Sequence, residues 1–160
     1  MRHLEISKIR PTDLPPLGSI IQDTDLFPPE MLADLVAEGQ AEGHVCLAAR
    51  LQGDLLGFVL VQPEPLTDGT WNMRALAVAP SSQARGVGKA LVAAAEKTLS
   101  EAQHRLLLVD TSGTSDFSKA RAFYRAVGYH KVAEIADFWR EGDAKITFAK
   151  VLNGSDQVRL

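Results

Sequence analysis

Apolar residues recur along this chain with two different periods, and segments of the two kinds alternate. Short segments with apolar residues at every second position, or at nearly every position, predict strands, whereas spacings of three or four predict helices. Residues 106–109 read Leu-Leu-Leu-Val, which is apolar on both faces and typical of a buried central strand. The predicted strands cover residues 4–10, 44–51, 55–61, 71–78, 105–111, 129–139 and 144–152. The predicted helices run from a cap at Asp13 through Ile21, over 29–40 and 86–102, and from a cap at Asp116 or Ser118 to Val127.

The elements follow the order β-α-α-β-β-β-α-β-α-β-β, which predicts an α/β (α+β) fold with a mixed, mostly antiparallel sheet and helices on both faces. The helix 86–102 connects the strands 71–78 and 105–111, and the crossover rule makes these two strands parallel. We expect a single domain over residues 1–152 and a polar tail over residues 153–160.

The composition excludes several classes of protein. Of the 160 residues, 46% are hydrophobic and 23% are charged, with a formal net charge of −3, as in ordinary globular proteins. Dedicated nucleic-acid-binding proteins usually carry a basic surface, so we expect no nucleic-acid partner. No segment has the length of a membrane span or the pattern of a secretion signal, so we expect a cytoplasmic protein with no membrane partner.

Cysteine and histidine suggest little chemistry. Cys46 is the only cysteine, so no intrachain disulfide can form, and its apolar neighbours predict a buried thiol. A catalytic pairing of Cys46 with His44 is the alternative. The histidines are scattered, with none three or four positions from another histidine or cysteine, so we predict no metal site.

The segment from Leu76 to Leu91 carries the strongest chemical signal. An apolar strand stops at Pro80, a short polar loop follows, and Gly86 and Gly88 open a long Ala-rich helix. The first backbone N–H groups of a helix have no partner within it and carry partial positive charge. Glycines there let an anion approach the backbone, so the segment predicts a site for a phosphate or pyrophosphate.

Two familiar phosphate motifs do not fit this loop. A Walker A loop needs a serine or threonine after its lysine, and Ala90 follows Lys89. A dinucleotide-binding fingerprint needs a third glycine where Leu91 stands. What remains is the pattern Gln83-x-x-Gly86-x-Gly88, for which a glycine-rich turn without a ligand is the alternative.

Together with a second motif, this pattern resembles the GCN5-related N-acetyltransferase (GNAT) superfamily. The first motif matches the family's acetyl-CoA loop, and the second, Ala120-x-x-Phe123-Tyr124-x-x-x-Gly128-Tyr129, matches a helix that ends in Tyr-x-x-x-Gly-Phe/Tyr. The element order also agrees over nearly the whole chain. One position departs from the family: Phe117 stands where an asparagine is frequent, so no cofactor contact of that asparagine is carried over.

The resemblance implies that acetyl-CoA is the co-substrate. Its pyrophosphate would bind the loop, and its pantetheine arm would lie between the splayed strands 76–78 and 108–110. The Val78 N–H would stabilise the oxyanion of the thioester, and Tyr124 would protonate the departing thiolate, unless Tyr124 only packs. The implied cofactor-binding residues are Leu76, Ala77, Val78, Gln83, Ala84, Arg85, Gly86, Val87, Gly88, Lys89 and Tyr124.

The resemblance implies an N-acetyltransferase acting by direct attack of a primary amine, for which we favour a small molecule. The alternatives are a protein N-terminus or lysine as acceptor, and an acyl-CoA-binding sensor without turnover. Asp110, at the end of a predicted buried strand, is the first candidate for the general base. The other candidate carboxylates are Glu64, Asp68, Asp23, Asp25 and Glu30. The candidate pocket aromatics are Trp71, Phe27, Phe138 and Trp139, and a homodimer is a possible assembly.

Overall fold

The computed structural model of the chain describes residues 3–24 and 26–152. Seven strands form one sheet in the order β1-β2-β3-β4-β5-β7-β6. They are β1 (Leu4–Lys8), β2 (Val45–Leu51), β3 (Asp54–Pro63), β4 (Thr70–Val78), β5 (Leu106–Ser112), β6 (His130–Arg140) and β7 (Asp143–Val151). The pair β4–β5 is parallel, and the pairs β1–β2, β2–β3, β5–β7 and β6–β7 are antiparallel. The predicted mixed sheet with one parallel pair is therefore confirmed; the predicted tail lies outside the described residues.

The helices also follow the predicted pattern, and short 3-10 turns lead directly into α1, α2 and α4. They are α1 (Leu14–Thr24), α2 (Leu32–Ala41), α3 (Val87–Glu101) and α4 (Ser118–Ala126). The predicted cap of the last helix was wrong. The 3-10 turn Ser115–Phe117 runs directly into α4, and Phe117 occupies the cap position without a side-chain hydrogen bond. The turn continues the chain into the helix and leaves no place for a capping carboxylate or hydroxyl.

The described residues fall into two compact units. The first comprises the described residues up to Gln62 together with Arg74–Thr98, and the second comprises Pro63–Met73 together with the described residues from Leu99 to Leu152. We call them the N-terminal unit and the C-terminal unit, and we describe each by itself. The strand β4 contributes its first half to the C-terminal unit and its second half to the N-terminal unit.

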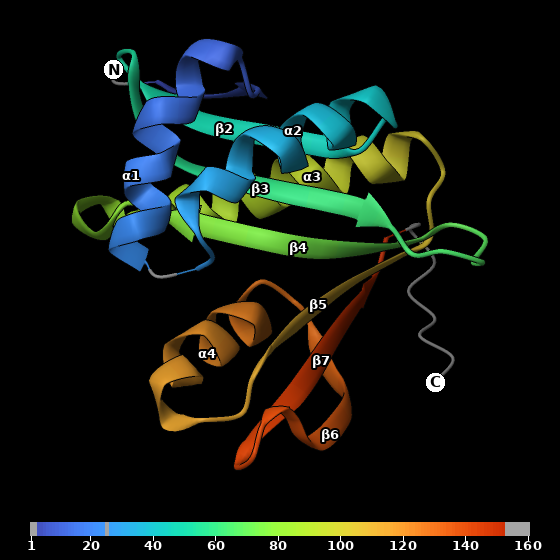
Figure 1. The fold of residues 1–160 in the computed structure, drawn as a ribbon. Helices are drawn as coiled ribbons and strands as arrows, with labels where there is room; N and C mark the ends of the chain where they lie inside the picture. The colour runs from blue at the N-terminus through green and yellow to red at the C-terminus, as the bar shows by residue number, and fades with distance from the viewer. Residues whose placement is uncertain (1–2, 25, 153–160) are drawn as a thin grey trace. The chain divides into compact units, whose positions relative to one another are not determined.

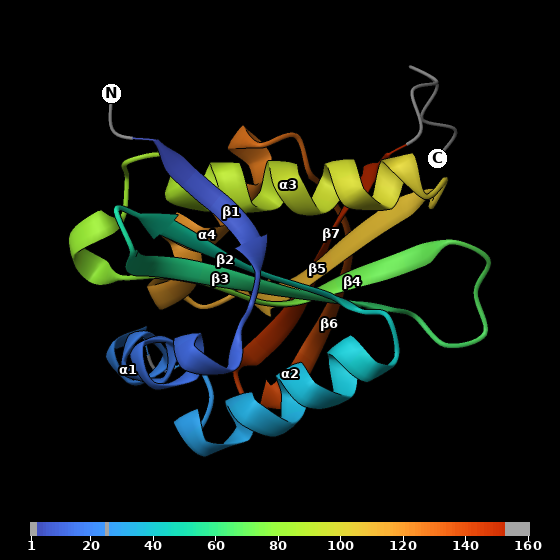
Figure 2. The ribbon, with the colours of Figure 1, turned by 90° about the horizontal axis from the view of Figure 1, so that it is seen from above.

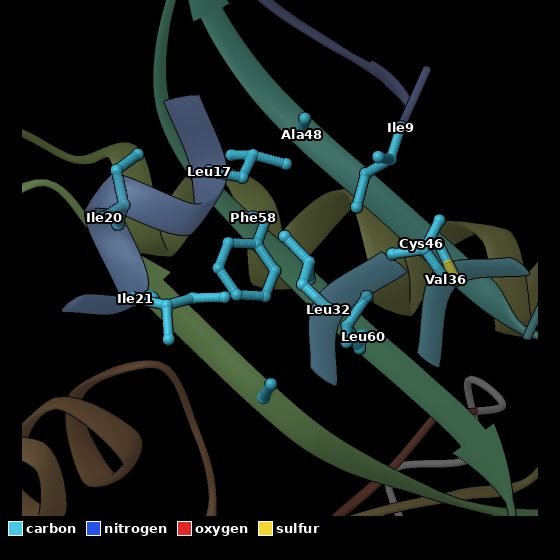
Figure 3. Close-up of a cluster of buried hydrophobic side chains, with 12 residues drawn as sticks. Ile9, Leu17, Ile20, Ile21, Leu32, Val36, Cys46, Ala48, Phe58 and Leu60 are labelled. Atoms are coloured by element: carbon cyan, nitrogen blue, oxygen red, sulfur yellow. The ribbon is translucent and has the colours of Figure 1, made fainter. Parts of the chain in front are cut away.

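The N-terminal unit is a sheet covered on both faces. Helices α1 and α2 lie on one face of its strands and α3 lies on the other (Figures 1 and 2). Beneath α1 and α2, apolar side chains from both helices meet those of β2 and β3, and Phe58 is fully buried at their centre (Figure 3). Burial of such side chains contributes about 1.5–3 kcal/mol each, so this core holds the strand ends in place.

A buried ion pair lies within the N-terminal unit. Arg50 of β2 contacts the side chains of Asp13 and Ser7, and Asp13 also accepts a hydrogen bond from the Arg10 backbone N–H at 2.7 Å. The side chains of Arg50 and Asp13 are only 5% and 6% exposed. We call Ser7, Asp13 and Arg50 the arginine cluster.

The C-terminal unit places α4 against the strands β5 and β7. The parallel register joins Thr70–Met73 of β4 to residues 106–109 of β5. In the antiparallel register of β5 and β7, Val109 lies opposite Phe148 and Asp110 lies opposite Thr147. Phe148 and Val109 are buried, whereas every residue of β6 is exposed. The strand β6 therefore lies outside the buried apolar part of this unit.

Candidate active site

The loop between β4 and α3 has the geometry of an anion site. Ala84 and Gly86 both adopt left-handed backbone conformations, with φ of 61° and 83°. The first backbone bond of α3 runs from the Ala90 N–H to the Gly86 carbonyl at 3.0 Å, so the N–H groups before Ala90 lack partners in the helix. A Cβ atom at Gly86 would meet no atom within 4 Å. Residues 83–86 are exposed, which leaves the loop accessible to a ligand.

The charges at this loop favour an anion. The first turn of α3 contains no acidic residue, although acidic residues are the usual partners of a helix N-terminus. Arg85 and Lys89 are exposed there instead, and within the described part of the chain neither forms an ion pair. Two cations beside the positive end of a helix repel it unless a negative group lies between them.

Two contacts hold the end of β4 beside this loop. The Gln83 side-chain amide donates to the Val78 carbonyl oxygen at 3.1 Å, so Gln83 ties the loop to the strand. On β3, the absence of a side chain at Gly57 lets the backbone of β4 lie close to β3. A Cβ at Gly57 would lie 2.5 Å from the Ala77 carbonyl oxygen and 3.2 Å from the Val78 Cα. The sequence analysis did not single out Gly57; a glycine inside a strand was the available signal.

Tyr124 combines packing with an uncommitted hydroxyl. Its ring lies 5.9 Å from that of Phe148, 6.2 Å from that of Tyr129 and 5.4 Å from that of Phe123. Burial raises the pKa of Tyr124 to about 12, so the phenol stays protonated at neutral pH. Among the residues described, none forms a hydrogen bond with this hydroxyl. The ring is thus a structural element, and the hydroxyl is a donor available to a ligand.

Asp110 belongs to a polar cluster of the C-terminal unit. The Asn72 amide group donates to Glu64 Oε1 at 2.8 Å and to Asp110 Oδ2 at 3.2 Å, and the Thr147 hydroxyl donates to Asp110 Oδ1 at 2.6 Å. We call Glu64, Asn72, Asp110 and Thr147 the carboxylate cluster. We expected Asp110 to lie at the end of its strand. Instead, β5 continues past Asp110 to Ser112.

Asn72 is the member of this cluster that the sequence analysis missed. It is only 3% exposed, and its Oδ1 is a buried oxygen atom without a hydrogen-bond partner. Leaving such an acceptor unpaired costs about 1–3 kcal/mol. An asparagine within a strand pattern was the only signal in the sequence, since asparagine is disfavoured in strands.

The other candidate carboxylates do not join this cluster. Asp68 is exposed in the turn before β4, where its backbone carbonyl accepts a bond from the Arg105 side chain at 2.7 Å. Asp23 and Glu30 are exposed in the N-terminal unit, and Asp25 lies outside the described residues. Of the candidate aromatics, Trp71 is buried against His104 and Phe27 is half-buried, whereas Phe138 and Trp139 are exposed on β6.

A cavity of about 250 Å³ lies within the N-terminal unit, lined by apolar residues of α2, β2 and β3 together with His44, Cys46 and Arg74. Burial raises the pKa of the Cys46 thiol, which keeps it protonated and unreactive. The prediction of a buried thiol is confirmed. His44 lies 3.3 Å from Glu42 across a surface contact.

Within residues 3–24 and 26–152, no group of three or more histidine, cysteine, aspartate or glutamate side chains could hold a metal ion. No helix in the same ranges has the length and apolar character needed to cross a membrane.

A family model described as an acetyltransferase (GNAT) domain matches residues 42–131 of this chain. The chain belongs to the GNAT family. The match includes β4, the loop after it, α3, β5 and α4, so the elements that carry both motifs lie inside it. The family transfers acetyl groups, and the resemblance inferred from the sequence is confirmed.

Solved structures show the same fold. A GNAT-family protein from Desulfovibrio desulfuricans has a TM-score of 0.87 at 27% identity, covering 94% of this chain and 99% of that one. The ribosomal-protein-S18-alanine N-acetyltransferase of Escherichia coli has a TM-score of 0.79 at 20% identity, covering 99% and 100%. An aminoglycoside 6'-N-acetyltransferase complexed with coenzyme A also has a TM-score of 0.79 at 20% identity, covering 96% and 99%. No curated protein sequence matches the chain.

Proposed function

We propose that this GNAT protein transfers the acetyl group of acetyl-CoA to a primary amine, for which a small molecule remains our preferred class. The observation that carries the proposal is the loop Gln83–Lys89. It combines two left-handed residues, unpartnered helix N–H groups and two unpaired cations, and a pyrophosphate needs these features. The aminoglycoside acetyltransferase with coenzyme A bound supports the same cofactor for this fold.

The residues fit distinct roles in this reaction. Arg85 would bind a phosphate through the fork of its guanidinium and Lys89 as a point charge, beside the N–H groups of Val87 and Gly88. Gln83 would hold the end of β4, so that the Val78 N–H donates to the oxyanion that develops on the thioester oxygen. In this proposal Leu76 and Ala77 complete the strand segment along the pantetheine arm.

Tyr124 would stabilise the departing thiolate by donating its free hydroxyl hydrogen. With its pKa raised to about 12, the phenol is a weaker acid than a thiol of pKa near 8.5. Donation of a hydrogen bond is therefore favoured over complete transfer of the proton to the sulfur. Asp110 would accept the proton of the attacking amine, directly or through water.

The acceptor class is not decided by the solved structures. One has a protein alanine as acceptor and another an aminoglycoside, and both have the same TM-score with this chain. Our preference for a small molecule stays a proposal, and a protein amine is the second candidate. Formation of an acetylated product, detected by mass spectrometry in a mixture of amines and peptides with acetyl-CoA, would also exclude a sensor without turnover.

The cofactor assignment is tested with Gly86→Glu and a matched control, Gly53→Glu. Both glycines have positive φ, 83° and 90°, and a Cβ atom at either would meet no atom within 4 Å. The backbone strain is therefore alike, and only Gly86→Glu brings a negative charge to the proposed pyrophosphate site. We expect calorimetry to show acetyl-CoA binding about 100-fold weaker or absent for Gly86→Glu, and within about twofold of wild type for Gly53→Glu. Unchanged affinity in folded Gly86→Glu would exclude the loop as the cofactor site.

A further inference from the structure

The carboxylate cluster has more acceptors than donors. Two carboxylates, Glu64 and Asp110, share the amide group of Asn72, which is the only nitrogen among the four side chains. Thr147 supplies one further donor, to Asp110 Oδ1 at 2.6 Å. No lysine, arginine or histidine of the described ranges forms an ion pair with Glu64 or Asp110. The cluster therefore holds negative charge that the protein itself does not balance.

Asn72 shows that one more donor is missing. Its nitrogen faces both carboxylates, so the amide orientation is determined: the reverse orientation would set its oxygen against two other acceptors. The remaining atom, Oδ1, is buried and has no partner. Native proteins rarely leave such an acceptor unpaired, and an unpaired one calls for an explanation by function.

The cluster is held in place and is open to solvent. The backbone of Glu64 is fixed in the turn before β4, since its N–H donates to the Thr70 carbonyl at 2.8 Å and its carbonyl accepts from the Thr67 hydroxyl at 2.8 Å. Glu64 and Asp110 are both half-buried, and both accept hydrogen bonds from the buried Asn72. A ligand can therefore reach the carboxylates without unfolding the turn.

We propose that Glu64, Asn72 and Asp110 form the recognition site for the ammonium group of the acceptor amine. A primary ammonium carries three N–H donors and one positive charge, which complement two half-buried carboxylates, and Asn72 between them has an oxygen that still lacks a donor. The inference rests on the proposed acetyl transfer to an amine, and it narrows the acceptor class. Two carboxylates repel a third, so the site selects alkylamines that carry no carboxylate and disfavours amino acids.

The test measures binding, not turnover. Calorimetry with coenzyme A at saturation, which cannot donate an acetyl group, is carried out with 1,4-diaminobutane and with 4-aminobutanoate as probes. The two molecules have similar length, and the second replaces one ammonium with a carboxylate. For the wild-type protein we expect 1,4-diaminobutane to bind about tenfold more tightly or better. Equal affinities, or no binding of either amine up to about 10 mM, would overturn the proposal.

Two variants locate the binding. Glu64→Gln keeps the side-chain shape and removes its charge, and we expect it to weaken 1,4-diaminobutane binding at least about tenfold. Asp68→Asn removes a charge from the same turn outside the cluster and should leave the affinity within about twofold. Asn72→Leu should weaken binding as Glu64→Gln does, with a thermal melt to establish that it folds. Equal amine affinity in Glu64→Gln and wild type would overturn the proposal.

The same experiment separates this inference from the proposed function. If the wild-type protein did not bind coenzyme A, the proposed function itself would be contradicted. Normal coenzyme A binding with amine binding that does not depend on Glu64 would overturn only the ammonium site. Binding of Mg²⁺ or Ca²⁺ that depends on Glu64 and that 1,4-diaminobutane does not displace would assign the cluster to a metal instead.

Discussion

The two polar clusters of this protein, one in each compact unit, differ in how completely they are paired. In the arginine cluster, the Arg50 guanidinium meets the Asp13 carboxylate and the Ser7 hydroxyl, and Asp13 accepts a backbone bond as well. In the carboxylate cluster, two negative groups share one amide, and the amide oxygen is buried without a donor. The first balances charge and hydrogen bonds; the second balances neither.

This difference separates a structural role from a functional one. A buried ion pair with its hydrogen bonds satisfied joins β2 to the start of α1 and needs nothing from outside. A cluster that lacks a donor and a positive charge is complete only when a ligand provides both. The fold therefore accepts a local cost in the C-terminal unit, as functional sites commonly do.

The largest expected effect comes from breaking the arginine cluster. Arg50→Met leaves the Asp13 carboxylate buried without its partner, so we expect the free energy of unfolding to fall by about 3–5 kcal/mol. Denaturant unfolding followed by circular dichroism measures this change.

The double variant Arg50→Met with Asp13→Leu is the matched control, because it removes both charges and should recover most of the stability. If the single variant lost less than about 1 kcal/mol, the two clusters would not differ in the way we describe.

A second prediction concerns Tyr124, whose hydroxyl also lacks a protein partner. Tyr124→Phe keeps the ring contacts with Phe148 and Tyr129 and removes only the hydroxyl, so we expect kcat to fall about 100-fold with acetyl-CoA affinity nearly unchanged. Steady-state kinetics at saturating substrates, beside a binding titration, measures both.

The pH dependence gives an independent check on Tyr124. Burial raises its pKa to about 12, so the hydroxyl keeps its proton over the whole range below about pH 11. The wild-type rate should show no loss from Tyr124 ionisation between pH 8 and pH 10. A Tyr124→Phe variant with the wild-type rate would leave Tyr124 as a packing residue only.

The smallest expected effect is that of a change in the carboxylate cluster on stability. Glu64→Gln removes one of two neighbouring negative charges that no described cation balances, so we expect the stability to stay within about 0.5 kcal/mol of wild type or to rise. The same unfolding measurement applies. A loss of about 2 kcal/mol or more would show that the carboxylate cluster, like the arginine cluster, holds the fold together.

The sequence predicted the fold well because hydrophobic periodicity is a local signal. The run at residues 106–109 lies in β5, although only Leu107 and Val109 of it are buried and Leu106 and Leu108 are half-buried, and the glycines after β4 marked the start of α3 to within one residue. The loop before α3 could be located for the same reason, since its residues are consecutive, and its role as the cofactor site stays a prediction.

The carboxylate cluster could not be predicted, because its members come from separate elements. Asn72, Asp110 and Thr147 lie on three different strands, and only the register of β4, β5 and β7 brings them together. The prediction of the α4 cap was wrong for a related reason. The turn Ser115–Phe117 continues into the helix, and the capping preferences of Asp116 and Ser118 do not reveal this continuation.

The strand β6 has a consequence for how the protein behaves at high concentration. It is the last strand of the sheet and carries four large exposed apolar residues, Val132, Ile135, Phe138 and Trp139. A straight edge of this composition would invite strands from other molecules and promote aggregation. However, its pairing with β7 shifts register twice, and Asp137 adopts a φ of 55°. Such irregularities bend an edge strand and interrupt its row of free backbone groups, so they help to keep neighbouring molecules from adding strand to strand.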